Sequence, residues 1–303
     1  MEKFDCAIIG AGPAGLSASL TLGRARKKVL LFDNGTNRNR VTHESHGFLT
    51  RDGITPASFK EISLLDLKKY PAVYYQERTV SKITRRLDGL FIISTLEHIE
   101  YVAKKIILAT GVQEIFPSIP YIKEYYGKSL FSCPYCDGWE LQDRPLIAIA
   151  EKEEHAIHIG KLVSNWSQDL IIATNGYELT HSTVEEFHRK NIVVKTEPMQ
   201  GLHGEGGYLK SVTFESGDEI EREAGFIVPS FHRPNQFAEQ LDCEIKENGA
   251  IVIDNFGRTT QEHIYVAGES AKNGPASVII AAADGSKVAA TVNMDLINEK
   301  FEI

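Results

Sequence analysis

Two cysteines separated by two residues, Cys133 and Cys136, are the residues whose types and spacing most directly indicate chemistry. This spacing lets both sulfurs meet at a tight turn, and the first turn of a following helix would lower a thiol pKa and favour the reactive thiolate. Asp137 follows the pair directly, and its carboxyl group can give or take the proton that thiol–disulfide exchange requires. The motif therefore predicts a redox-active cysteine pair with an acid/base beside it.

A zinc half-site is the alternative interpretation of the same two cysteines. Structural zinc takes four ligands, commonly from two such pairs. The remaining cysteines, Cys6 and Cys243, are isolated in the sequence, and we expect Cys6 to be a small buried apolar residue of a strand. We therefore favour redox chemistry and expect no metal.

A glycine-rich segment near the N-terminus has the pattern of a dinucleotide-binding turn. It follows an apolar run at residues 4–9 and precedes a helical pattern at residues 16–24. In such a turn the glycines permit the tight bend, the close approach of backbone to a pyrophosphate and the packing of helix on strand, and the helix start favours the anion. The expected binding residues are Gly10, Gly12, Pro13, Ala14 and Gly15.

Asp33 ends the next apolar run, about 20 residues further on, where a carboxylate can accept hydrogen bonds from a ribose diol. This first motif alone does not distinguish NAD from FAD. Two later segments resemble the second and third FAD signatures of flavoproteins with two dinucleotide-binding domains, and so favour FAD. They contain Ala109, Thr110 and Gly111 after a buried strand, and Gly268 and Glu269 after a late apolar strand.

The composition is that of an ordinary globular protein, and 303 residues suggest about two domains. The formal net charge of -8 disfavours nucleic acid and anionic membranes as partners, because both favour a basic surface. The sequence has neither a signal-peptide pattern at its start nor a run of about 18 apolar residues. We therefore expect a cytoplasmic protein whose partner is a small molecule or a small protein.

Alternating strand and helix patterns along the chain predict parallel sheets. Residues 34–58 have no clear period and are expected to form a long loop, a length that is usually functional. The expected strands are residues 4–9, 28–32, 83–93, 101–108, 146–150, 170–174, 226–228 and 264–267, and the expected helices are residues 16–24, 155–164 and 275–293.

With these motifs in this order, the chain resembles the low-molecular-weight thioredoxin reductases, the class II pyridine nucleotide-disulfide oxidoreductases. The resemblance covers essentially the whole chain. It implies an α/β fold with two Rossmann-like three-layer domains and a homodimer. The FAD-binding domain, residues 1–113 and 231–303, would be split by a central domain of the NAD(P)H-binding type, residues 114–230, that carries the cysteine pair.

The same resemblance implies roles for the site residues. By motif position, Cys136 would face the flavin, Cys133 would attack the partner disulfide and Asp137 would be the acid/base. Glu269 would hold the ribityl chain, at a position where many members have Asp. The implied function is that of an FAD-dependent disulfide oxidoreductase, acting on a thioredoxin-like protein or on a small-molecule disulfide or dithiol.

The chain departs from this family at the expected nucleotide site of the central domain. Family members that use NADPH carry a second G-x-G-x-x-A after the strand that follows the cysteines, whereas residues 151–155 here are Glu-Lys-Glu-Glu-His. A pyrophosphate would meet side chains and negative charge there. Residues 173–176, at the end of the next strand, contain no Arg or Lys for a 2′-phosphate. We therefore expect no normal NADPH binding.

Other features resemble a divergent branch that includes oxidases of small dithiols, which pass electrons to oxygen. These features are the loop with His43 and His46, and Trp139 and Glu140 after the cysteines. Many such oxidases have His after the second cysteine, so Asp137 is a reductase-like feature. A flavin-dependent dithiol oxidase and a non-enzymatic flavin redox sensor both remain alternatives, and the two histidines are equally interpretable as solvated loop residues.

Overall fold

The structure is a computed structural model that describes residues 2–271 and 276–301. The chain forms two compact units: residues 1–40, 48–113 and 232–303 make the first, and residues 41–47 and 114–231 make the second. The chain passes between the units on either side of residues 41–47 and again at two short strands that pair with each other, β7 (Gln113–Ile115) and β16 (Ser230–His232).

The sequence-based division places residues 41–47 in the first domain, whereas in the structure they pack with the second unit. The close contact is between backbones: a Cβ added at Gly127 would lie 2.5 Å from the carbonyl oxygen of Val41. Gly127 has a φ of 80°, a conformation that favours glycine. The early loop thus contributes a short segment to the unit that carries the cysteine pair.

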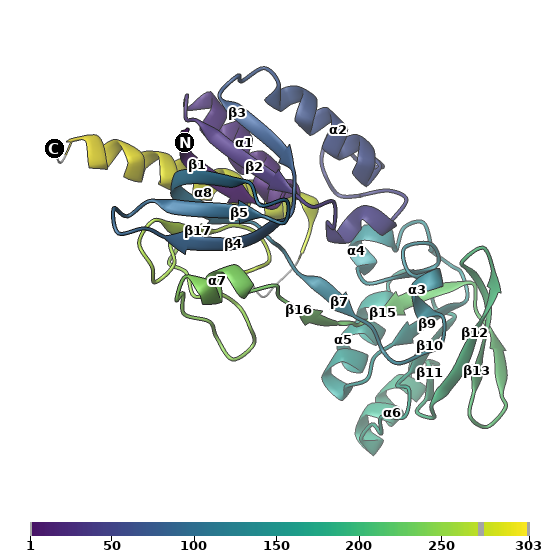
Figure 1. Cartoon of the computed structure of the whole chain (residues 1–303). Helices are drawn as coiled ribbons and strands as arrows, with labels where there is room; N and C mark the ends of the chain where they lie inside the picture. Colours follow the sequence, from purple (N-terminus) through teal and green to yellow (C-terminus); the bar gives the residue numbers. More distant parts are fainter. Residues whose placement is uncertain (1, 272–275, 302–303) are drawn as a thin grey trace. The chain divides into compact units, whose positions relative to one another are not determined.

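The first unit is built on a parallel sheet with strand order β3-β2-β1-β6, and β17 pairs with the C-terminal end of β6 (Figure 1). The N-terminal half of β6 pairs instead with an antiparallel hairpin of β4 and β5. The strands are β1 (Lys3–Ile9), β2 (Val29–Asp33), β3 (Val73–Glu77), β4 (Val80–Arg85), β5 (Phe91–Thr95), β6 (Glu100–Leu108) and β17 (Ile264–Val266).

Alternating side chains of these strands pack into two hydrophobic cores, one on each face of the sheet. Ile8, Leu31 and Ile107 face the helices, and their neighbours Ile106 and Leu30 face the hairpin. The helices are α1 (Pro13–Arg24), α2 (Pro56–Leu67) and α8 (Val278–Phe301) on the first core and α7 (Gln236–Gln240) on the second. No helix in the described ranges, the 24-residue α8 included, is long and apolar enough to cross a membrane.

Several elements differ from those expected. Residues 83–93 form parts of two strands rather than one, because the chain turns at Gly89, which has a φ of 79°. The expected loop ends early, since Thr55 caps α2 by accepting a hydrogen bond from the Ser58 N–H at 3.0 Å. It contains a 3-10 helix, η1 (Arg38–Val41). Helix α8 continues to Phe301, and its expected start at Pro275 lies outside the described residues.

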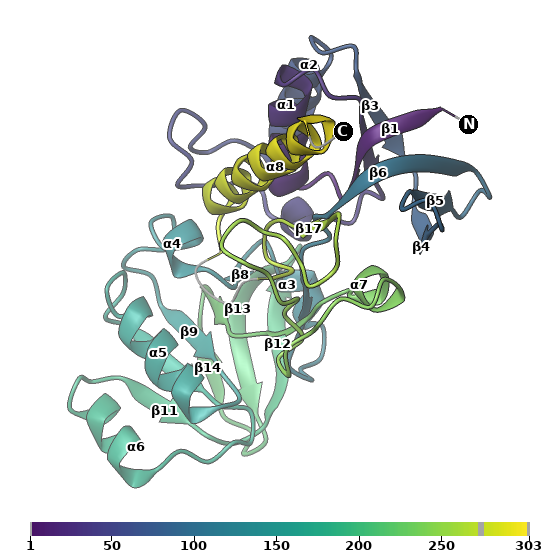
Figure 2. The ribbon, with the colours of Figure 1, turned by 90° about the vertical axis from the view of Figure 1, so that its left-hand side faces the viewer.

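The second unit is built on a parallel five-stranded sheet of order β11-β10-β9-β15-β8. Two helices cover one face, and an antiparallel sheet covers the other (Figure 2). The elements are β8 (Leu130–Phe131), β9 (Leu146–Ile149), β10 (Leu170–Ala173), β11 (Val193–Lys195), β12 (Met199–Glu205), β13 (Tyr208–Phe214), β14 (Glu219–Glu221), β15 (Ala224–Ile227), α3 (Ile122–Tyr125), α4 (Pro134–Asp137), α5 (Glu153–Val163) and α6 (His181–His188). The expected fold class, α/β with two three-layer Rossmann-like units, is confirmed.

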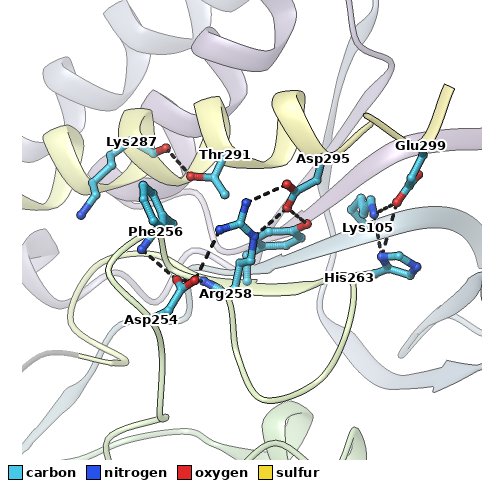
Figure 3. A network of polar contacts seen from close by, with 10 residues as sticks. Lys105, Asp254, Phe256, Arg258, His263, Lys287, Thr291, Asp295 and Glu299 are labelled. Atoms are coloured by element: carbon cyan, nitrogen blue, oxygen red, sulfur yellow. Dashed lines mark hydrogen bonds and ion pairs between the residues drawn. The ribbon is translucent and has the colours of Figure 1, made fainter. Parts of the chain in front are cut away.

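A polar network fastens the C-terminal half of α8 to the sheet of the first unit (Figure 3). Lys105 is fully buried on β6, forms an ion pair with Glu299 of α8 and lies 2.6 Å from Nδ1 of His263. Arg258 donates to both carboxylate oxygens of Asp295 at 2.9 and 2.7 Å. These pairs fix the helix that packs against α1, which carries the glycine turn.

Removing one partner of the Lys105 pair tests this anchoring. Glu299→Gln leaves a buried ammonium without its carboxylate and should lower the stability by about 1–3 kcal/mol. Lys105→Met keeps most of the side-chain volume and leaves no buried charge, so it should cost less. The apparent Tm of the flavin-loaded variants, followed by circular dichroism, checks this order. Equal decreases in Tm for the two variants, or a larger decrease for Lys105→Met, would contradict the expected order.

Candidate functional site

The glycine turn joins β1 to α1 through backbone contacts that exclude side chains. A Cβ added at Gly10, which has a φ of 109°, would lie 2.4 Å from the Ala109 carbonyl oxygen, and one at Gly15 would lie 1.8 Å from the Gly10 carbonyl oxygen. At Gly12, by contrast, a Cβ would meet no described atom within 4 Å. The turn is therefore packed tightly on two sides and open at Gly12.

The open side is the positive end of a helix. Gly12 is the N-cap of α1 and Pro13 its first residue, and among the described residues no side chain caps this end and no acid stands in its first turn. The backbone N–H groups of a first helical turn lack partners within the helix and attract an anion. This arrangement fits the pyrophosphate of a dinucleotide.

Asp33, at the end of β2, is buried and already has protein partners. Its carboxylate accepts hydrogen bonds from the Tyr75 hydroxyl at 2.6 Å and from the Gly35 N–H at 2.9 Å, and it forms an ion pair with Lys60. Burial opposes ionisation of Asp33, but the bonds from Lys60 and Tyr75 outweigh it and lower the pKa. Lys60 on α2 and Tyr75 on β3 were not expected as neighbours, because neither element was predicted.

The second and third expected motifs come together beside the first. The Ala109 N–H donates to the Ile9 carbonyl at 2.9 Å, and the Ala267 N–H donates to the Leu108 carbonyl at 3.0 Å. Across these strand ends the hydroxyls of Thr110 and Ser270 lie 3.1 Å apart. Gly111 and Gly268 have φ values of 65° and 81°, so both turns use a conformation that favours glycine. Three motifs distant in sequence thus meet at the carboxyl edge of one sheet.

Glu269, the acid of the third motif, is paired with Arg38 of η1 at 3.1 Å. Arg38 was not singled out in the sequence, although it lies in the loop expected to be functional. The neighbouring Gly268 N–H donates to the Asp284 carboxylate of α8 at 2.8 Å. Helix α8 therefore holds the backbone of the motif, while the side chain of Glu269 is oriented from the loop.

The cysteine pair lies in the second unit at the start of the short helix α4. Cys133 and Cys136 are joined by a disulfide, with their Cα atoms 5.2 Å apart. Cys133 is the N-cap of α4, and its carbonyl accepts from the N–H groups of Cys136 and Asp137 at 3.0 and 3.1 Å. Gly138 ends α4 against Trp166, since a Cβ there would lie 2.8 Å from the indole. The predicted redox pair is therefore formed within one tight turn.

Asp137 lies next to the disulfide in a partly buried position. Burial raises the pKa of this carboxyl to about 7, the charge of His46 opposes the rise and the charge of Glu140 adds to it. A carboxyl group with a pKa near 7 can both hold and release a proton at neutral pH. Of the two loop histidines, His46 is partly buried and its charge acts on this carboxyl, whereas His43 is exposed.

The carboxyl edge of the sheet in the second unit carries side chains where a dinucleotide would bind in a Rossmann-like domain. Glu151, after β9, accepts a hydrogen bond from the Asn175 side chain at 2.7 Å. Glu153, in the first turn of α5, accepts from the Thr180 N–H at 3.1 Å and from the Thr183 hydroxyl at 2.6 Å. Hydrogen bonds from Thr180 and then Thr183 lower the pKa of Glu153, which keeps it ionised.

Comparison with known proteins agrees with this arrangement. A family model described as pyridine nucleotide-disulphide oxidoreductase matches residues 4–285. The crystal structure of TrxB from Bacillus anthracis is 61% identical, with a TM-score of 0.96 over 98% of this chain and 99% of that one. An oxidoreductase structure from Agrobacterium tumefaciens is 31% identical, with a TM-score of 0.90 over 98% and 99%. The thioredoxin reductase of Helicobacter pylori is 26% identical over 95% of this chain and 97% of its own.

The family model covers most of the chain, so the resemblance inferred from the motifs is confirmed, and FAD is the cofactor implied by the family. The chain belongs to the pyridine nucleotide-disulphide oxidoreductase family and is an FAD-dependent disulfide oxidoreductase of the thioredoxin reductase type.

Proposed function

We propose that this oxidoreductase moves electrons between FAD and the Cys133–Cys136 pair without normal NADPH binding, and that its partner is a thioredoxin-like protein or a small disulfide or dithiol. The observation that carries the proposal is the pair itself, a disulfide formed beside a carboxyl group whose pKa is raised to about 7. The names of relatives such as the Helicobacter pylori thioredoxin reductase support the partner class.

The cofactor would be held by the three motifs of the first unit. FAD supplies a two-electron carrier at this site. The open helix end at Gly12 would receive its pyrophosphate, and Asp33, already oriented by Tyr75 and Lys60, would accept from its ribose. The other proposed binding residues are Gly10, Pro13, Ala14, Gly15, Ala109, Thr110, Gly111, Gly268 and Glu269.

The cysteines and Asp137 would carry out the exchange. In the reductive direction the thiolate of Cys133 attacks the partner disulfide, and Cys136 then displaces it and closes the Cys133–Cys136 disulfide. Two electrons and two protons pass to the partner, which becomes two thiols. Asp137 would give and take the proton at each displacement, since its raised pKa keeps both of its forms available at neutral pH.

The carboxylates of the second unit support the absence of normal NADPH binding. At the start of α5 a pyrophosphate would meet the ionised Glu153, which is held by Thr180 and Thr183. Glu151 and Asn175 join the ends of the two adjacent strands. An anion would be repelled there, and a helix end that already has acids in its first turn offers it little attraction.

The acids at the start of α5 also favour a second candidate, a flavin-dependent dithiol oxidase. A dithiol substrate would reduce the Cys133–Cys136 disulfide and leave as a disulfide. Oxygen would accept the two electrons and two protons as hydrogen peroxide, so no nucleotide site is needed. For either candidate we propose a cytoplasmic homodimer that binds neither nucleic acid nor membrane, supported by the family resemblance and by the net charge of -8.

Anaerobic titration of the purified yellow protein separates a nucleotide-driven enzyme from the proposed one. NADPH or NADH at near-stoichiometric amounts should leave the flavin absorbance unchanged, and dithionite, the control, should bleach it. A dithiol such as dithiothreitol should bleach it without nucleotide if the oxidase direction operates, with oxygen consumption on return to air. Bleaching by NADPH would contradict the proposal that the protein has no normal NADPH binding.

Replacing either cysteine tests the redox pair. Cys133→Ser and Cys136→Ser should abolish disulfide turnover while the protein stays yellow, because the flavin motifs lie in the other unit. Cys243→Ser is the matched control, since Cys243 is a buried free cysteine whose contact with Thr259 a serine can keep. Turnover is measured with a small disulfide and dithionite-reduced protein. Activity retained in both pair variants would rule out the assignment.

Replacing Asp137 tests its raised pKa. Between about pH 4 and pH 7 the native carboxyl keeps a proton that the unfolded chain has released, so the free energy of unfolding falls as the pH rises through this window. Asp137→Asn should remove this dependence and slow exchange on the order of 10²-fold or more. Denaturant unfolding at several pH values and exchange rates check both effects. An unchanged pH dependence would contradict the assignment.

A further inference from the structure

Residues 41–47 bring a histidine from the early loop into the unit that carries the disulfide. The side chain of His46 is only 17% exposed, and its Nε2 lies 3.5 Å from a carboxylate oxygen of Glu44 and 3.6 Å from one of Glu140. Glu44 belongs to the same segment, whereas Glu140 follows α4, three residues after Asp137. An imidazole is thus placed between carboxylates on two different parts of the chain.

Two carboxylates lie against this imidazole, Glu44 on its own segment and Glu140 after the cysteine turn, and the charge of His46 also acts on Asp137. Glu44 and Glu140 are about half exposed, and Asp137 is partly buried next to the disulfide. A positive imidazole favours the ionised form of a nearby carboxyl, and a second carboxylate disfavours it. His46 and Glu140 therefore act on Asp137 with opposite sign, as the direction of each contribution to its pKa indicates.

We propose that His46, held between Glu44 and Glu140 beside the cysteine turn, is a positioning residue for the disulfide exchange, and that His46 and Glu140 together set the pH range in which the exchange runs. The inference rests on the acid/base role proposed above for Asp137. It assigns a function to the loop segment that packs with the second unit, and it makes the pH range of exchange depend on residues outside the Cys-x-x-Cys motif. His46 and Glu140 need not touch the partner.

Paired substitutions should move the pH profile in opposite directions. His46→Gln removes the opposing charge, so the pKa of Asp137 rises and the profile shifts to higher pH. Glu140→Gln removes the supporting charge and shifts the profile to lower pH. Each shift should be at least about half a pH unit, as one charge at short range produces. The control is His43→Gln, an exposed histidine of the same segment, which should follow wild type.

Two readouts are needed. The first is the anaerobic rate at which dithionite-reduced protein, freed of excess reductant, cleaves the disulfide 5,5′-dithiobis(2-nitrobenzoate) across the pH range. The second is the carbon-13 titration of the Asp137 carboxyl in aspartate-labelled protein, assigned by its loss in Asp137→Asn. The second readout reports the pKa of Asp137 itself. A purely structural role of His46 would leave that pKa unchanged.

The outcomes distinguish a failure of the proposed acid/base role of Asp137 from a failure of the proposed role of His46 and Glu140. If Asp137→Asn leaves the wild-type pH profile unchanged, the proposed role of Asp137 fails. If Asp137→Asn flattens the profile but His46→Gln and Glu140→Gln both superimpose on wild type, only the present inference fails. Should His46→Gln unfold, Glu140→Gln still decides the matter, since it leaves residues 41–47 intact and has a shift of predicted sign.

Discussion

Helix α1 packs against its neighbours at distances that admit no side chain, and the proposed cofactor site of the first unit depends on this contact. A Cβ added at Gly15 would lie 1.8 Å from the Gly10 carbonyl, and one at Gly285 of α8 would lie 2.0 Å from the Ala14 carbonyl. Glycine at both positions lets α1 lie against β1 on one side and α8 on the other. The start of α1 then lies at the strand ends where the second and third motifs turn. All three motifs therefore depend on the same backbone arrangement.

How far the sequence predicts this structure depends on how local each signal is. The glycine turn, the strands around it and the cysteine turn are encoded in adjacent residues, and each was placed correctly. The partners of Asp33 were missed, because Tyr75 lies 42 residues away on a strand without a clear pattern. Residues 41–47, which include His46, were expected in the first domain and pack with the second for a related reason: a loop segment carries no periodicity that indicates which unit it joins.

The second unit shows a helix start at the edge of a Rossmann-like sheet that carries acids of the chain itself. A helix that starts at a sheet edge has a positive end, which a pyrophosphate compensates in a nucleotide-binding domain. Here Glu153 and Glu154 in the first turn of α5 supply negative charge, and Glu153 is held by the threonines near the start of α6. The positive end of α5 is thus compensated by acids of the chain itself, and this compensation is the basis of the proposed loss of normal NADPH binding.

The arrangement around Asp137 also bears on the direction of electron flow. An acid with a pKa near 7 is present in both forms at neutral pH, and so it can serve the closing and the opening of the disulfide equally. The cysteine turn and its proposed acid/base therefore do not select reduction over oxidation. That choice must come from which partner delivers electrons most readily, and if nucleotide binding is lost as proposed, the thiols would be the route by which electrons enter.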